Sequence, residues 1–328
     1  MFNQNSKAMK TLKKLFLFIA VIGLLFSCSK DDGFLGRDQP ELNYGNEEFC
    51  KPSNGLDQDR YVTMRVIDNN NHWINLKVHY RIIGKGPVDM VFIPGWTNPL
   101  TVYTKQFDYF RDKARSIYVD LPGHGLSDAP EGIEYTQALM ADAIYFIIRK
   151  EGVHHFIGVG FSWGWKPLQL LESMHPGMIT RLVHLDVGVL TWPPMSQATR
   201  EATYAAQMAW TEANKTSTAT EPEDFVEWVQ YYKYFPNWLL ANMYYHFLAE
   251  EVCQPYPWTI PILGIWRAMV PGSAAETKMK LYFPGVEIIA IGGNNHAIQW
   301  VQADLVNQLI DDFIPDRPGR RHGPGRIY

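Results

Sequence analysis

The chain has 328 residues, of which 46% are hydrophobic and 20% are charged, and its formal net charge is -4 at pH 7. This balance is typical of a folded globular protein and excludes a disordered chain, a collagen and a coiled coil. The net negative charge gives no general affinity for nucleic acid. Three cysteines are too few for a disulfide scaffold and lack the spacing of a zinc site, so no metal is predicted.

The first 27 residues are predicted to be a signal peptide. Four lysines between residues 7 and 14 precede an apolar run from Leu15 to Phe26, which is short for a bilayer-spanning helix. The run ends in Leu25-Phe26-Ser27-Cys28, which resembles a bacterial lipobox, although Phe26 is unusual in that motif. The resemblance implies lipidation of Cys28 and a lipoprotein anchored to the cell envelope of a Gram-negative bacterium, at the outer membrane or cell surface. The alternative is a simple secretory signal in which Cys28 is incidental.

Residues 28–60 are polar and rich in Gly, Pro, Asp and Asn, which predicts a tether between the anchor and the fold. Cys50 lies in this tether, and Cys253 lies far along the chain. An oxidising compartment would allow the two to pair, whereas two free or separately buried thiols are the alternative that we favour.

From Tyr61 the sequence alternates predicted strands and helices. Residues 62–68 and 74–83 alternate apolar and polar side chains, as half-exposed strands do. Short apolar runs predict six further strands, at 88–93, 116–121, 156–160, 182–187, 260–265 and 286–291. Helical periodicity predicts helices over 136–150, 163–174, 273–283 and 298–314. Such alternation predicts an α/β fold with a mostly parallel sheet and helices on both faces.

Residues 190–258 interrupt this alternation after the sixth predicted strand. They have a helical composition, no strand signal and a high density of Trp, Tyr and Phe, which predicts an inserted helical cap. The core then comprises residues 61–189 and 259–314, and the polar tail 315–328 is predicted to be disordered. The aromatic cap favours an apolar or aromatic substrate, although most of these rings are expected simply to pack against one another.

One motif predicts catalysis. Gly160-Phe161-Ser162-Trp163-Gly164 fits the pattern G-x-S-x-G between a predicted strand and a predicted helix. The turn is so sharp that the residues two before and two after Ser162 must be small. It lifts the hydroxyl above the sheet at a helix N-terminus, where amide groups favour developing negative charge. The alternative is a tight turn in which Ser162 only caps the helix.

Four segments in chain order resemble the α/β-hydrolase superfamily over about residues 61–314. They are Pro94-Gly95-Trp96, the turn Asp120-Leu121-Pro122-Gly123-His124-Gly125-Leu126-Ser127, the Ser162 motif, and Gly292-Gly293-Asn294-Asn295-His296 after the last strand. Trp163 and the inserted cap are similar to the branch that contains esterases, C–C hydrolases, haloalkane dehalogenases and epoxide hydrolases. The resemblance implies the α/β-hydrolase fold and a cap that roofs the nucleophile.

The resemblance also implies a role for each matched residue. Ser162 would attack a carbonyl carbon, and His296 would accept its proton. The backbone N–H groups of Trp96 and Trp163 would hold the oxyanion. No metal and no nicotinamide or flavin cofactor is implied. Dehalogenases and epoxide hydrolases of this branch need a carboxylate nucleophile, which a serine does not supply.

The catalytic acid departs from the usual pattern. The family most often places an Asp after the seventh strand, but residues 261–272 contain neither Asp nor Glu. A minority of members take the acid from the end of the sixth strand, where this chain has Asp186. We therefore predict a Ser162–His296–Asp186 triad, with a cap glutamate (Glu250 or Glu251) or no acid at all as the alternatives.

These features predict a cofactor-free serine hydrolase that cleaves carboxylic esters with apolar or aromatic groups through an acyl-enzyme. Cleavage of an amide, lactone or C–C bond, or a proline-type aminopeptidase activity, fits the same triad. The competing class is a non-catalytic surface binding protein on a hydrolase scaffold, because a fold does not by itself imply a function. The expected partner is a small apolar molecule, and the sequence leaves the oligomeric state open.

Overall fold

The computed structural model describes residues 57–186, 196–215, 235–249, 258–267, 273–293 and 295–314. The predicted signal peptide with Cys28, the tail 315–328 and the Cys50–Cys253 pair lie outside these residues, and these predictions remain predictions. The first strand begins at Gln58, within the last residues of the predicted tether. No helix in the described ranges combines the length and apolarity needed to cross a membrane.

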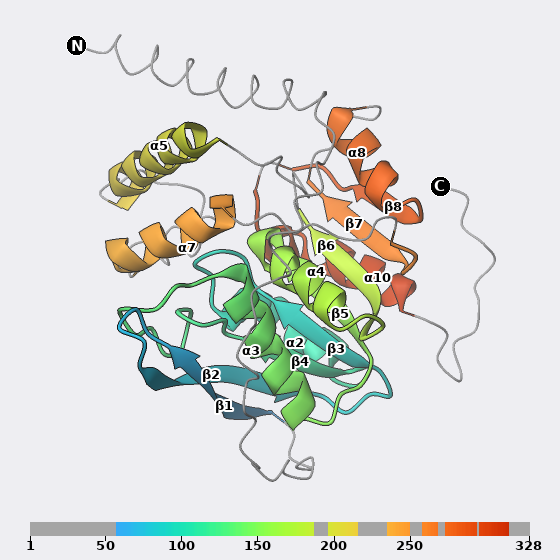
Figure 1. Cartoon of the computed structure of the whole chain (residues 1–328). Coiled ribbons are helices and arrows are strands. Elements are labelled where there is room, and N and C mark those ends of the chain that lie inside the picture. The colour runs from blue at the N-terminus through green and yellow to red at the C-terminus, as the bar shows by residue number, and fades with distance from the viewer. Residues whose placement is uncertain are drawn as a thin grey trace, which may run out of the picture. The chain divides into compact units, whose positions relative to one another are not determined.

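Eight strands form one sheet in the order β1-β2-β4-β3-β5-β6-β7-β8 (Figure 1). Their bounds are Gln58–Ile67 (β1), Trp73–Ile83 (β2), Asp89–Ile93 (β3), Arg115–Val119 (β4), Phe156–Phe161 (β5), Ile179–Leu185 (β6), Ile262–Trp266 (β7) and Val286–Ala290 (β8). Strand β2 pairs antiparallel with β1 and β4, and all the other neighbours pair in parallel. The predicted α/β fold with a mostly parallel sheet is confirmed.

The burial of each strand follows from what covers it. Strand β1 alternates exposed and more buried residues over much of its length, whereas every residue of β5 and β7 is buried. Parallel strands read as continuous apolar runs because the crossover helices cover both faces.

Helices pack on both faces of the sheet. One core cluster joins it to residues of α3 (Gln137–Lys150), α4 (Trp165–Met174) and α8 (Ala274–Tyr282), which cover the same face. A second cluster joins the other face to η1 (Leu100–Tyr103), α2 (Thr104–Phe110), α9 (Ile298–Val301) and α10 (Ala303–Phe313). Local capping sets two of the starts, since the Thr136 and Ser273 hydroxyls accept from backbone N–H groups of α3 and α8.

Two helical features differ from the sequence prediction. Helix α2 was not anticipated, because its seven residues are shorter than the window over which a helical period shows. It is held by tertiary contacts: the buried Gln106 amide donates to Gln299 O (2.8 Å) and to Asn307 Oδ1 (2.9 Å). The closing helix, predicted to run unbroken, is interrupted at Gln302, whose φ of -125° is not helical.

Between β6 and β7, the described residues form two helices, α5 (Gln197–Lys215) and α7 (Asn237–Ala249), and no strand. Helix α7 packs on the core through buried Leu240 and Met243. Its Asn242 Oδ1 accepts from Tyr135 N at 2.8 Å. Near its C-terminus, the Phe247 carbonyl accepts from the buried Lys166 ammonium at 3.0 Å, which is favourable at the negative end of a helix dipole.

Candidate active site

The nucleophile motif forms a sharp turn at the end of β5. Ser162 begins a single 3₁₀ turn, η2 (Ser162–Gly164), and has a φ of +50°. A Cβ on Gly160 would lie 2.7 Å from Trp165 Cα, and one on Gly164 would lie 2.2 Å from Pro94 O. Both positions therefore require glycine, as the motif predicts, and the strained serine is of the kind that gathers at functional sites.

The three predicted triad residues meet at the carboxyl edge of the parallel strands. His296 Nε2 lies 2.8 Å from Ser162 Oγ, and His296 Nδ1 lies 2.5 Å from Asp186 Oδ2. Ser162 follows β5, Asp186 follows β6 and His296 follows β8, so three crossovers bring them together. The Asp186 side chain is 8% exposed and that of His296 is 22% exposed, which leaves the imidazole accessible from one side.

Asp186 is held on both carboxylate oxygens. Its Oδ1 accepts from the backbone N–H of Arg267 at 3.0 Å, and its Oδ2 lies 3.0 Å from the Arg267 guanidinium Nε. Arg267 directly follows β7, in the segment where the resemblance leads one to expect the acid. An arginine there instead orients the carboxylate that β6 supplies.

Among the described residues, the other candidate acid is engaged elsewhere. Glu276 belongs to α8, where its backbone N–H donates to the Ser273 hydroxyl and its carboxylate pairs with Lys280 at 2.6 Å. Glu250 and Glu251 lie outside the described residues. No group of three or more potential metal ligands occurs in the part of the chain that the structure describes.

The predicted oxyanion loop packs against the elbow. A Cβ on Gly95 would lie 3.0 Å from the Phe161 ring, so the loop approaches the residue before the nucleophile. The Trp96 ring packs against Tyr244 of α7 in a tilted arrangement, with centroids 5.0 Å apart. The Trp163 ring lies 5.7 Å from the ring of His124, whose pKa is lowered to about 4 by burial. The roles of the Trp96 and Trp163 N–H groups remain a prediction.

Trp165, the first residue of α4, packs in a cluster of rings. Its indole is almost fully buried and lies against the rings of His184, Trp258 and Phe283. His184 is also fully buried, and burial holds its pKa well below the usual value. The Trp165 indole therefore joins α4 to rings from β6, from the segment before β7 and from the end of α8.

Asp120, from the family-like turn after β4, braces the loops beside the site. Its Oδ1 accepts from Leu100 N (2.6 Å), and its Oδ2 accepts from Leu126 N (3.0 Å) and contacts His79 Nδ1 (2.7 Å). Burial opposes protonation of His79, but hydrogen bonds to Asp120 and Asp59 outweigh it and raise the pKa of the imidazole. The sequence analysis missed this role of His79; its place beside inward-facing Val78 and Tyr80 on a sheet strand was the available signal.

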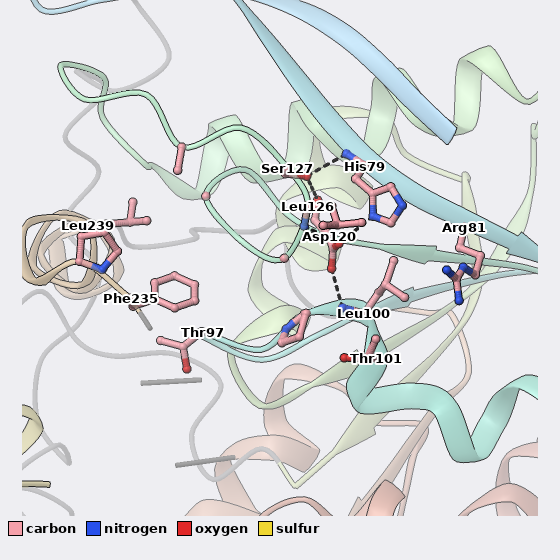
Figure 2. Close-up of a pocket in the computed structure, with 15 residues that line it drawn as sticks. His79, Arg81, Thr97, Leu100, Thr101, Asp120, Leu126, Ser127, Phe235 and Leu239 are labelled. Atoms are coloured by element: carbon pink, nitrogen blue, oxygen red, sulfur yellow. Dashed lines mark hydrogen bonds and ion pairs between the residues drawn. The ribbon is translucent and has the colours of Figure 1, made fainter. Parts of the chain in front are cut away.

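A cavity of about 500 Å³ lies beside these loops (Figure 2). Phe235 and Leu239 lie on one side of it, and His79 and Arg81 lie on the other. Its remaining lining includes Thr97, Leu100, Gly123 and Leu126 from the loops after β3 and β4. The triad side chains do not line this cavity. Two of its lining residues, Thr97 and Gly123, are sequence neighbours of Trp96 and His124, and the His124 ring contacts Trp163 of the nucleophile turn.

Comparison with known proteins agrees with this architecture. Residues 90–247 match the family model described as alpha/beta hydrolase fold. The chain is 32% identical over 128 residues to 2-(acetamidomethylene)succinate hydrolase of Mesorhizobium japonicum, over 39% of this chain and 44% of that protein. It is 27% identical over 140 residues to epoxide hydrolase 3 of Xenopus tropicalis, over 42% of this chain and 36% of that protein. The matches thus span less than half the length of these curated relatives.

Among solved structures, a thermophilic esterase from Thermogutta terrifontis superposes with a TM-score of 0.63 at 18% identity, covering 77% of this chain and 97% of the esterase. At that identity the likeness shows the fold alone. The sheet, the family model and the superposition therefore agree that this chain has the α/β-hydrolase fold, with an esterase among its structural neighbours.

Proposed function

We propose that the chain is a serine hydrolase of carboxylic esters that carry apolar or aromatic groups, working through an acyl-enzyme and without a cofactor. The observation that carries this proposal is the continuous hydrogen-bonded chain from Asp186 through His296 to Ser162. A serine hydroxyl is a weak nucleophile by itself and needs an adjacent base that is held in the correct tautomer.

The proposed reaction follows from the direction of these bonds. Nδ1–H of His296 donates to Asp186, which leaves Nε2 free to accept the Ser162 proton as Oγ attacks the ester carbon. The tetrahedral oxyanion is held by backbone N–H groups, for which Trp96 and Trp163 are the candidates. The intermediate collapses as His296 returns the proton to the departing alkoxide. Water, activated by the same imidazole, then releases the acid and restores the serine.

The identity of the nucleophile favours an ester over an epoxide. An epoxide hydrolase is among the relatives, but members of this superfamily that open epoxides are expected to use a carboxylate, and this chain has Ser162 at the elbow. The apolar side chains of Phe235 and Leu239 beside the cavity, and the contact between the Trp96 and Tyr244 rings, support a substrate with apolar or aromatic groups.

Labelling with a fluorophosphonate tests the proposal, because the probe reacts with an activated serine and with little else in a folded protein. Wild-type protein should be labelled at Ser162 and should hydrolyse short-chain and aromatic p-nitrophenyl esters. Ser162→Ala is the control and should show neither property. Folded wild-type protein that resists the probe would favour the binding-protein alternative. Labelling without ester turnover would direct the search to amide, lactone, C–C or aminopeptidase substrates.

We also propose that the mature chain is held at the cell envelope by lipid on Cys28. The Lys-rich start, the apolar run and the polar segment that follows support this proposal.

A further inference from the structure

One face of helix α7 contacts both residues that are the candidates for the oxyanion donors. The Trp96 ring packs against the Tyr244 ring with centroids 5.0 Å apart. The Trp163 ring lies 6.5 Å from the Phe247 ring. Tyr244 and Phe247 stand three residues apart on α7, which places them on one face of the helix, and their rings are stacked 5.9 Å apart. The same helix face therefore bridges the two loops that carry Trp96 and Trp163.

Lys166 holds this face of α7 against the nucleophile helix. It lies in the first turn of α4, four residues after Ser162, and is 5% exposed. Its Nζ donates to the Phe247 carbonyl at 3.0 Å and lies 4.2 Å from the centre of the Phe247 ring. Carbonyl groups in the last turn of a helix have no acceptor role within that helix, and both they and an aromatic face attract a cation. One ammonium thus binds the end of α7 and the ring that contacts Trp163.

The burial of Lys166 makes this contact stronger than a similar one at the surface. A buried ammonium loses its hydration, so it stays buried only where close polar contacts offset that loss. Such contacts are strengthened by surroundings of low dielectric constant. Lys150 offers a comparison, because its Nζ also donates to a backbone carbonyl, that of Tyr61, at 3.0 Å, but in an exposed position.

The alignment of the oxyanion donors depends on what packs around them. A backbone N–H group stabilises the oxyanion only when it points to the place where the negative charge develops, and small displacements cause large losses of rate. Both loops have strained backbone beside the candidate donors, since Thr97 has a φ of +67° and Ser162 a φ of +50°. Strained backbone persists only where neighbouring groups hold it. The rings of α7 are such neighbours for both loops.

We propose that Lys166 is a positioning residue for the oxyanion hole: by binding Phe247 it keeps α7 seated on Trp96 and Trp163, and so keeps their N–H groups aligned. The cap then affects the rate of the chemical step and not only the choice of substrate. The inference rests on the proposed ester hydrolysis and adds the part of the cap that completes its oxyanion hole.

Lys166→Met tests the inference because it keeps an unbranched apolar side chain and removes the charge and the donor. Its kcat on p-nitrophenyl esters should fall by about ten- to hundredfold with little change in KM, since misaligned oxyanion donors weaken an interaction made in the transition state. Lys150→Met is the matched control, because it removes the exposed contact of the same kind, and its kcat should stay at the wild-type value.

A tetrahedral inhibitor separates this role from a merely structural one. An alkyl trifluoromethyl ketone adds to an activated serine and gives an adduct with an oxyanion in the hole. Its Ki should rise in Lys166→Met by about the factor by which kcat/KM falls, whereas the Ki of the corresponding alcohol, which carries no oxyanion, should be unchanged. Hydrogen exchange of the α7 amides should become faster in the same variant.

Phe247→Leu provides a second test that leaves the carbonyl partner of Lys166 in place. It should also lower kcat and weaken ketone binding without raising KM. The double variant should lose less than the product of the two single losses, because both changes act through one contact. If Lys166→Met does not fold, Phe247→Leu decides the outcome.

A raised KM with unchanged kcat in these variants would overturn the inference, and so would wild-type values of kcat and of the ketone Ki. If either result came with normal fluorophosphonate labelling of wild-type Ser162, only the inference would fail. Wild-type protein that is neither labelled nor active on esters would instead refute the proposed function, and the inference with it.

Discussion

Neighbouring groups hold the Asp186 carboxylate in place beside His296. Asp186 has a φ of +51°, and Arg267 contacts both of its carboxylate oxygens. A neutral amide at this position would keep those neighbours but would favour the wrong imidazole tautomer. Asp186→Asn should therefore fold normally and lose about three to four orders of magnitude in kcat on p-nitrophenyl esters.

Glu276→Gln is the matched control for Asp186→Asn, because it neutralises the next acid after β7, which pairs with Lys280. Its kcat should stay near the wild-type value. A loss of less than about tenfold in Asp186→Asn would be too small for a tautomer defect and would reassign the acid, with Glu250 and Glu251 as the next variants to make.

Ser162 and His296 are expected to act as a unit, because the 2.8 Å contact between them carries the proton transfer. Ser162→Ala and His296→Ala should each remove nearly all ester hydrolysis. The double variant should be little worse than either single variant, since removing one partner already disables the other. Steady-state kinetics together with circular dichroism check both activity and folding. Multiplicative losses in the double variant would mean that the two residues act separately.

Helix α3 contains a carboxyl that weakens the fold at neutral pH. Burial raises the pKa of Asp142 to about 6, from 3.8 for an unperturbed Asp. Because the folded-state pKa is the higher one, the folded chain binds the proton more tightly. The contribution of Asp142 to stability is therefore fully present below about pH 4 and is lost as the pH rises through about 6.

Asp142→Asn removes this titration. The variant should be more stable than wild type by about 1–3 kcal/mol at pH 7.5, and its advantage should vanish near pH 4. Urea unfolding at several pH values measures the difference, and Asp112→Asn, a change at an exposed acid, serves as the control. A stability difference that is constant across pH would contradict the prediction.

The helices and strands could be predicted where their apolar residues form a continuous run or a regular period along the sequence. The buried strands β3 to β7 and the amphipathic helix α3 were found because covering layers demand continuous or periodic apolar residues. Helix α2 was not found, because its seven residues are too few to show a helical period, and its contacts, such as those of the Gln106 amide with residues 299 and 307, are with distant parts of the chain. Contacts between such distant residues leave no periodic trace in the sequence.

At the scale of the whole molecule, the proposed anchor predicts where the protein is found. Cys28→Ser should release the mature chain from the membrane fraction into the soluble fraction, because lipid would no longer be attached. Cell fractionation with immunoblotting measures this, and Cys50→Ser is the matched control, which should stay membrane-bound. Unchanged membrane retention of Cys28→Ser would mean that a different feature holds the protein there.

The sequence by itself determined the α/β class, the strand succession and the nucleophile turn, because each rests on neighbouring residues: apolar runs, helical periods and glycines that a Cβ would obstruct. The sequence also reduced the number of candidate catalytic acids, because residues 261–272 contain neither Asp nor Glu. Only the tertiary structure decided which carboxylate reaches His296, since Asp186 is 110 positions away and its orientation depends on Arg267 from a third strand. The cavity that Thr97 lines likewise arises where the loops after β3 and β4, strand β2 and the start of α7 converge. The positive φ of Thr97 and its unpaired hydroxyl result from the folded backbone, and no local sequence pattern predicts them.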